Sequence, residues 1–488
     1  MLDRNQTVKR ERLAVCAAAV ALILLRSVVP VRYEGYFFDS DQAIIGLMAR
    51  HLSTFQRFPL FFYGQNYMLG VQSWLIAPVF WIIRPSVAAM RVPFVLLNGV
   101  VAVWLIGALS RRLELRPLIA FVAALPFIIP TPAVAARLLE AQGSCVEPFV
   151  YILLLWQLRQ RPLAFGALLA FGFLHREFTI FALPALAIVE ANTGEFWSYA
   201  NVRRAGWMAA GFGALWLCVD GLKVYLSGAT LGLQVAMLGG QLCLDLHDMI
   251  GRGSSEITQA LPMLYGWTSV RLEELSINSP VSTGSVIVGW MAALAVLTMV
   301  ARLAWCWRRE GRLSTADGFP VYLVTVGVFT VYAYPLSCAV VPGIPPLLRY
   351  LLLALLIPIG CYGAFMRRES SAALRVGVTG VFVLWAAANG VDNVRLIRAS
   401  ALQAPPNEHR VLADYLVSHQ IQYARATYWD AYALDFLTQE RVIVASTDNV
   451  RIADYQQRVD AHQATAVNLP RIPCAGGETV ASWCVQKP

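Results

Sequence analysis

The sequence predicts a polytopic α-helical membrane protein, because of its composition, its long apolar segments and the arginine clusters between them. Of the 488 residues, 58% are hydrophobic and only 14% are charged, with a mean hydropathy of +0.56. A soluble globular protein cannot bury that much apolar surface, whereas membrane-spanning helices expose it to lipid. The net charge of +9 does not indicate nucleic-acid binding, because the arginines occur in short clusters typical of the ends of membrane spans.

The first span is expected at residues 13–31, directly after a basic cluster that begins at Arg4. Basic residues next to a span stay in the cytoplasm, so we expect the N-terminus on the cytoplasmic side. The apolar run has no small-residue cleavage site, which favours an uncleaved span over a signal peptide. The residues that follow, from Phe37 onwards, are therefore expected outside the cytoplasm.

Two segments after the first span are expected to lie along the outer membrane surface. Residues 43–52 are amphipathic, and residues 67–83 are apolar but interrupted by Gln72 and Pro78. If residues 67–83 spanned the membrane, the arginine cluster at Arg111 would lie on the outer side, which basic clusters avoid. We therefore predict two juxtamembrane helices in the first outer loop.

With this assignment the remaining arginine clusters alternate regularly, and the sequence predicts about 11 transmembrane helices. A long outer loop separates the seventh from the eighth. After the first, the spans are expected at 92–109, 118–133, 148–158, 163–174, 178–190, 205–225, 286–305, 320–341, 347–365 and 374–391.

A small second domain is expected at 399–488, after a membrane domain at 1–398. Its pattern predicts a helix at 409–419, a strand at 423–429, a helix at 431–438, a strand at 441–445 and a helix at 450–461. This is typical of a small α/β domain, which the topology puts outside the cytoplasm. Cys474 and Cys484 lie in this domain, where a disulfide is permitted, and two free thiols are the alternative.

Polar side chains from several separate loops fall on the outer side of this topology. Carboxylates and cations that meet at a membrane surface suit a reaction whose leaving group is a lipid phosphate. A carboxylate can deprotonate an acceptor hydroxyl, while a cation offsets the charge of the departing phosphate. The candidate residues are Asp39, Asp41, Gln42, Arg57, Tyr63, Gln65, Asn66, Gln72, Arg137, Glu140, Glu147, His175, Arg176, Glu177, Arg349 and Tyr350.

Several motifs resemble the membrane-embedded glycosyltransferases with the GT-C fold. The motifs are FDSDQAIIGLMARHL, FFYGQNYMLGVQSWLIAPVF, GSCVEP, GFLHREF and LLRYLLLALLIP. The resemblance is strongest to the branch of protein O-mannosyltransferases, aminoarabinose transferases and lipopolysaccharide galacturonosyltransferases. It implies a polyprenyl phosphate sugar donor and a catalytic aspartate in the first outer loop.

The resemblance also implies roles for individual residues. Asp41 is expected as the catalytic base and Glu147 as a second catalytic acidic residue. We expect the donor phosphate to be bound by His175, Arg176, Arg349 and Tyr350. The remaining substrate contacts are expected from Asp39, Gln42, Tyr63, Gln65, Asn66 and Gln72.

Two residues depart from the family's pattern. Gln42 stands where the family usually has Glu, and Gln72 stands where many relatives have Glu. An amide forms hydrogen bonds, but it does not titrate and is a weaker ligand for a divalent cation. The need for a divalent cation therefore stays open, and a weakened or inactive member of the family is an alternative.

Purely structural roles compete with these assignments. Aspartate is a preferred helix N-cap, and we favour that role for Asp39 and catalysis for Asp41. Glu147 at a helix start could interact with the helix dipole, and Arg349 could extend to the membrane edge. One acidic cluster in the long outer loop is more typical of a surface turn than of a metal site: Asp245, His247 and Asp248.

The sequence favours an inverting glycosyltransferase of the bacterial inner membrane. It would transfer a sugar from a polyprenyl phosphate donor to a lipid, glycan or protein acceptor outside the cytoplasm, with no nucleic-acid partner. A transporter or flippase of lipid-linked sugars is the main alternative. It is less favoured because the spans carry few interior charges and no internal repeat is apparent. A non-catalytic protein that binds lipid-linked sugars is the third possibility.

Overall fold

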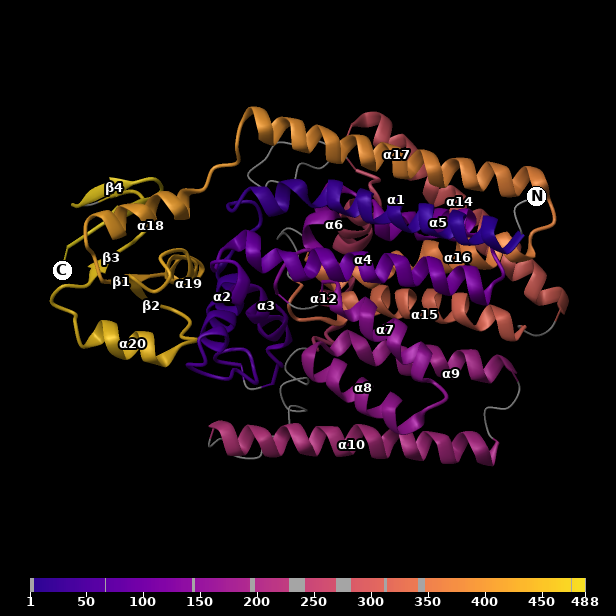
Figure 1. Cartoon of the computed structure of the whole chain (residues 1–488), viewed down its shortest axis with the longest axis horizontal. Helices are drawn as coiled ribbons and strands as arrows, with labels where there is room; N and C mark the ends of the chain where they lie inside the picture. Colours follow the sequence, from indigo (N-terminus) through magenta and orange to yellow (C-terminus); the bar gives the residue numbers. More distant parts are fainter. Residues whose placement is uncertain are drawn as a thin grey trace.

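Long helices lie side by side in one bundle, and a small α/β unit covers one end of it. The computed structural model describes residues 4–65, 67–142, 145–193, 198–227, 242–268, 282–310, 314–340, 347–474 and 476–487. The N-terminus lies at the end of the bundle opposite the α/β unit (Figure 1). The prediction of a polytopic helical membrane protein is confirmed.

Six of the described helices are long and apolar enough to cross a membrane. They correspond to six of the expected spans and are α1 (Arg4–Arg32), α4 (Val87–Arg112), α10 (Tyr199–Ser227), α14 (Thr283–Glu310), α15 (Gly318–Ala333) and α17 (Ala372–Leu402). The last of these continues through position 398, where a division between two domains was expected.

The other expected spans are shorter or interrupted. Three are short apolar helices: α5 (Pro117–Ile128), α7 (Glu147–Leu158) and α8 (Pro162–His175). The third expected span is broken after Ile128, and the chain forms a second short helix, α6 (Pro132–Arg137). The break occurs because Pro130 and Pro132 lack the N–H groups that a continuous helix needs. Two others begin with 3-10 turns. In one, η1 (Glu177–Phe181) precedes α9 (Ala182–Thr193). In the other, η6 (Leu348–Tyr350) and η7 (Leu352–Leu355) precede α16 (Leu356–Arg368).

Two helices occupy the positions expected for the juxtamembrane segments, α2 (Ser40–Ser53) and α3 (Val71–Ile82). Figure 1 shows both between the bundle and the α/β unit. The helix α2 begins at Ser40 because the side chain of Asp39 caps it, accepting a hydrogen bond of 3.0 Å from the Gln42 N–H. This cap sets the position of Asp41 in the first turn.

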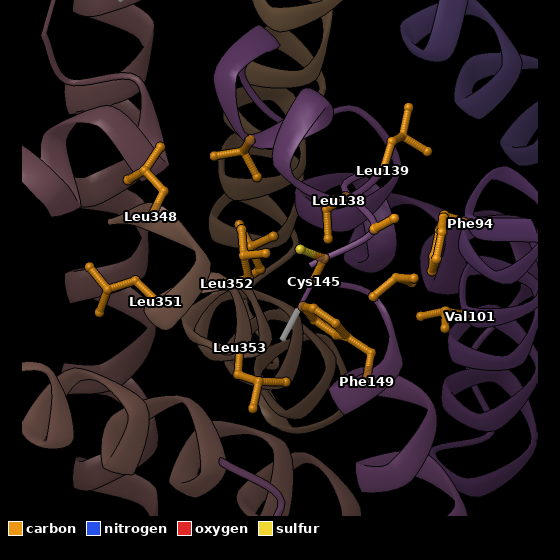
Figure 2. Packing of buried hydrophobic residues seen from close by; sticks show 14 of the residues in the cluster. Phe94, Val101, Leu138, Leu139, Cys145, Phe149, Leu348, Leu351, Leu352 and Leu353 are labelled. Carbon is orange, nitrogen blue, oxygen red and sulfur yellow. The ribbon is translucent and has the colours of Figure 1, made fainter. Parts of the chain in front are cut away.

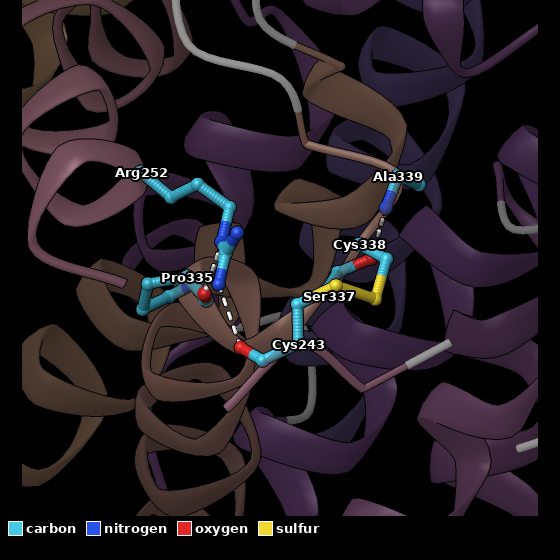
Figure 3. Close-up of a disulfide and its surroundings, with 6 residues drawn as sticks. All are labelled: Cys243, Arg252, Pro335, Ser337, Cys338 and Ala339. Carbon is cyan, nitrogen blue, oxygen red and sulfur yellow. Dashed lines mark hydrogen bonds between the residues drawn. A yellow bond between two sulfur atoms is a disulfide. The ribbon is translucent and has the colours of Figure 1, made fainter. Parts of the chain in front are cut away.

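The described part of the long outer loop contains α12 (Leu246–Ser255), a π-helical turn (Glu256–Ala260) and α13 (Leu261–Tyr265). Asp245 caps α12 by accepting from the Asp248 N–H at 3.0 Å, so the Asp245 side chain has a structural role. Figure 3 shows a disulfide between Cys243 and Cys338, which sequence reasoning missed. It joins this loop to the segment after α15.

The α/β unit is built on three parallel strands in the order β2-β1-β3. Its elements are α18 (Glu408–Ser418), β1 (Tyr423–Ala426), α19 (Tyr428–Leu437), β2 (Ile443–Ser446), α20 (Ala453–Asp460) and β3 (Val467–Asn468), followed by a hairpin of β4 (Glu478–Val480) and β5 (Trp483–Val485). A disulfide joins Cys474 to Cys484, the two cysteines that the sequence singled out.

One boundary in this unit was predicted wrongly. The strand expected at 423–429 ends at Ala426, and Tyr428 and Trp429 already belong to α19. The Tyr428 N–H donates to Asp448 Oδ1 at 2.7 Å, and Asp430 lies in the first turn, where a negative charge stabilises a helix. These polar contacts start the helix three residues before the expected position at 431.

The buried core supports the end of the bundle beneath the α/β unit. Figure 2 shows side chains from distant segments packed together, with Leu348, Leu351, Leu352 and Leu353 on one side and Leu138, Leu139, Cys145 and Phe149 opposite. Arg349 lies between Leu348 and Leu351 in sequence, and Gln142 between Leu139 and Cys145. Dense packing of these apolar neighbours therefore fixes the backbone that carries both polar residues.

Candidate active site

The carboxylate of Asp41 lies between a tyrosine of the α/β unit and an arginine of the bundle. The Tyr428 hydroxyl donates a hydrogen bond to Asp41 Oδ1. Asp41 Oδ2 lies 3.9 Å from Nη1 of Arg349. The Asp41 side chain is 27% exposed, so a molecule in the adjoining space can reach it.

Asp39 has a structural role beside this carboxylate. One oxygen accepts from the Gln42 N–H at 3.0 Å, and the other accepts from Nε2 of Gln142. Burial, together with the charge of Asp41, raises the pKa of Asp39 to about 6. Since both oxygens already accept hydrogen bonds, Asp39 is held as the cap of α2, the role we favoured from the sequence.

Gln142 connects the acidic and basic parts of the site, and sequence reasoning did not single it out. Its side chain donates to Asp39 and accepts from Arg349, while its carbonyl oxygen accepts from Arg176. The only sequence signal was a polar residue directly before the GSCVEP motif. Gln142 thus holds two arginines that come from segments far apart in the chain.

Two cavities of similar size meet at Asp41, with volumes of about 540 and 560 Å³. Both are lined by Asp41, Gln142, Arg349 and Trp429. The first cavity is also lined by further polar and charged residues, namely Gln65, Tyr67, His175, Arg176, Glu177, Tyr350, Tyr428, Asp448, Asn449 and Arg451. The second is completed by Phe37, Phe38, Asp39, Arg137, Leu347, Asn407, Glu408, His409, Arg471 and Trp483, among others.

The α/β unit supplies cavity residues from the carboxyl ends of its parallel strands. Tyr428 and Trp429 follow β1, Asp448 and Arg451 follow β2, and Arg471 follows β3. Ligand sites in parallel sheets commonly form at this edge. The strand expected at 441–445 together with that rule was a signal that could have found Asp448 and Arg451.

Several residues that were expected at the site lie in a separate, buried polar chain. Gln72 Nε2 donates to Glu147 Oε1 at 2.8 Å and lies 2.6 Å from His175 Nε2. The other ring nitrogen of His175 lies 2.8 Å from the Tyr151 hydroxyl. Glu147 is not among the described residues that line either cavity. Of this chain only His175 reaches the first cavity, and both its ring nitrogens already have partners.

The remaining predicted contacts have varied positions. Gln42 donates through Nε2 to the Phe37 carbonyl oxygen at 2.5 Å. It is not among the described residues that line either cavity. Tyr63 binds His51, with 2.8 Å between its hydroxyl and Nδ1. Gln65 and Tyr350 line the first cavity. Asn66 lies outside the described residues.

The described residues around Asp41 do not fit a bound divalent cation. Such a cation needs several oxygen ligands that are free of other donors. Here Asp41 faces a tyrosine hydroxyl and a guanidinium, and both oxygens of Asp39 accept hydrogen bonds. The arginine side chains supply the positive charge at this place.

The fold resembles two kinds of solved membrane proteins. No protein-family model matches the sequence, and no sequence among curated proteins matches it. ArnT from Cupriavidus metallidurans bound to undecaprenyl phosphate has a TM-score of 0.59 at 11% identity, covering 94% of this chain and 93% of that one. The oligosaccharyltransferase AglB from Archaeoglobus fulgidus, in complex with an inhibitory peptide and a dolichol-phosphate, has a TM-score of 0.51 at 10% identity, covering 94% and 69%. These similarities confirm the GT-C fold that the motifs predicted.

Proposed function

We propose that this protein is a glycosyltransferase that transfers a sugar from a polyprenyl phosphate donor to an acceptor outside the cytoplasm. The observation that carries the proposal is the position of Asp41 and Arg349, which line both cavities. A transferase needs two substrates to meet at one base and one cation. The ligands of the structural neighbours, undecaprenyl phosphate and dolichol-phosphate, support this class of donor.

The first cavity suits the donor phosphate, because Arg176, Arg349 and Arg451 all line it. Guanidinium groups bind phosphate strongly through charge-assisted hydrogen bonds. The second cavity is then left for the acceptor. Its lining combines aromatic side chains with Arg137 and Arg471, and the exposed residue Trp429 lines both cavities.

The proposed reaction inverts the configuration at the anomeric carbon. Asp41 takes the proton of an acceptor hydroxyl as its oxygen attacks that carbon, and the bond between the sugar and the phosphate breaks. The electron pair leaves with the polyprenyl phosphate, whose charge the arginines offset. The site would lie at the outer face of the bacterial inner membrane, with the N-terminus in the cytoplasm.

The transporter alternative gains no support from these cavities, since both are lined by residues at the end of the bundle that carries the α/β unit. A flippase would need a pathway that also reaches the N-terminal end.

The test compares lipid-linked glycans by mass spectrometry in a deletion strain complemented with variants. Wild-type protein should restore a missing sugar, whereas Asp41→Asn should leave the lipid-linked donor to accumulate, since loss of a general base costs about 10²–10⁴ in rate. Asp414→Asn removes a carboxylate whose side chain is 69% exposed, and it should restore the sugar fully. Full restoration by Asp41→Asn at equal protein level would refute the proposal.

A further inference from the structure

The contact between Asp41 and Tyr428 joins residues that are 387 positions apart in the sequence. Asp41 belongs to the first turn of α2, while Tyr428 is the first residue of α19 in the α/β unit. The two helices pack directly against each other. Ser40, at the start of α2, accepts through its Oγ a hydrogen bond of 3.3 Å from the Ala433 N–H of α19. A side chain of the α/β unit thus touches the carboxylate on which the proposed reaction depends.

Tyr428 is held firmly in this position. Its N–H donates to Asp448 Oδ1 at 2.7 Å, and the guanidinium of Arg451 lies 5.6 Å from the centre of its ring. The ring of Tyr432 packs against it edge-on, with centroids 5.5 Å apart. Only 4% of Tyr428 is exposed, so the hydroxyl cannot swing away from Asp41 without moving its neighbours.

This arrangement makes the two oxygens of Asp41 unequal. Oδ1 accepts the tyrosine hydroxyl, whereas Oδ2 lies 3.9 Å from Arg349, beyond hydrogen-bond distance. Burial and the neighbouring carboxylate raise the pKa of Tyr428, so its hydroxyl keeps its proton and acts as a donor at neutral pH. Oδ2 is therefore the oxygen left to receive a proton from an acceptor.

We propose that Tyr428 is a positioning residue that fixes the Asp41 carboxylate through Oδ1 and directs Oδ2 at the acceptor. This inference rests on the proposed transferase function. It makes the α/β unit part of the catalytic site, in addition to any role in binding an acceptor. A tyrosine that only joined the two parts of the protein would affect stability but leave the chemistry of Asp41 unchanged.

The experiment measures initial rates of the full-length protein in lipid nanodiscs. The donor probe is the lipid extract of the deletion strain, in which the lipid-linked donor accumulates. Tyr428→Phe removes the hydroxyl and keeps the ring. We expect a maximal rate lower by about 10- to 100-fold, with little change in the extract concentration that gives half the maximal rate. We also expect the acidic limb of the pH–rate profile to move to higher pH, because the ionised base loses a donor.

Tyr415→Phe is the matched control. The Tyr415 hydroxyl donates to Glu478 Oε2 at 2.6 Å, which is the same kind of tyrosine–carboxylate bond on an exposed face of the same unit. This variant should behave as the wild type in rate and pH profile. Tyr428→His, which retains a ring N–H donor, should recover part of the rate lost in Tyr428→Phe.

The position of the limb on the pH axis does not depend on how much of a variant is folded, so it remains decisive if Tyr428→Phe is less stable. An unchanged pH profile and maximal rate in Tyr428→Phe, with Asp41→Asn inactive, would overturn the positioning role and leave the transferase standing. Activity in Asp41→Asn would instead overturn the proposed function itself.

Discussion

Replacing Glu440 with Gln tests whether the α/β unit holds helix α2 in place. Glu440 Oε1 accepts from His51 Nε2 at 3.0 Å and from the Tyr455 hydroxyl at 2.6 Å, while Oε2 accepts from Arg50. His51 and Arg50 lie in the last turn of α2, the helix whose first turn carries Asp41. One carboxylate therefore fixes the far end of the helix that carries Asp41.

The size of the effect follows from the pKa of Glu440. Burial opposes its ionised form, but the donors from His51 and Tyr455 and the charge of Arg50 prevail and lower the pKa from 4.5 to about 2. The side chain is only 16% exposed, so solvent screens these contacts little. A lowering of this size corresponds to about 3 kcal/mol of stability at neutral pH, as an order of magnitude. Glu440→Gln should lose most of it.

The stabilisation by Glu440 depends on pH. A depressed pKa means that the folded state favours the carboxylate, so its stabilisation is complete above the ordinary pKa of 4.5 and is lost as the pH falls toward 2. Thermal unfolding of the protein in detergent should therefore show a lower midpoint for Glu440→Gln than for wild type at pH 7. The difference should shrink as the pH is lowered from about 5 to 3.

Asp460→Asn provides a control in the same unit. Asp460 pairs with Arg425 at 2.7 Å, but its side chain is 54% exposed, and such surface pairs contribute about 0–1 kcal/mol. This variant should unfold close to the wild type. An equal midpoint for Glu440→Gln and wild type at pH 7, or a difference that persists undiminished at pH 3, would refute the reasoning.

Three further changes test other parts of the structure. Gln42→Glu replaces the donor to the Phe37 carbonyl oxygen with a carboxylate, and should lower the unfolding midpoint through a loss of about 1–3 kcal/mol, whereas Gln42→Met should cost less. Trp429 is 56% exposed and lines both cavities, so we expect its ring to contact the donor. Trp429→Ala should raise the half-saturating donor concentration up to about tenfold, with Trp429→Phe intermediate, and no change would contradict this contact. Cys243→Ser should destabilise the protein more than Cys474→Ser, because the two disulfides span 95 and 10 residues. The loop-entropy model gives losses of about 5 and about 3 kcal/mol. The reverse order of the midpoints in thermal unfolding would contradict this prediction.

The sequence predicted the features that depend on local pattern. Apolar runs and arginine clusters identified the long helices, and the Asp39 cap follows from the residues around it. Separate outer loops were expected to bring Asp41 near an arginine, and Arg349 lies 3.9 Å from it. Topology alone made that convergence predictable, since both residues fall on the same side of the bundle.

Other contacts between distant segments could not be predicted in this way. No local pattern links Tyr428 to Asp41, and the apolar and aromatic residues around Tyr428 read as the end of a strand. Gln142 has no signal of its own, because its role depends on three partners from separate parts of the chain. The Cys243–Cys338 bond likewise depends on how the long outer loop folds back.

The two glutamines that depart from the family's pattern do not weaken the case for catalysis. Gln42 and Gln72 are both absent from the described residues that line the two cavities, so neither substitution removes a carboxylate that could meet a substrate. Each acts as a donor, to the Phe37 carbonyl oxygen in one case and to Glu147 in the other. A glutamate at position 72 would set two buried carboxylates side by side, which is costly unless one takes up a proton. The amide at position 72 lets Glu147 keep a hydrogen-bond donor, and the proposed base Asp41 is unaffected by either glutamine.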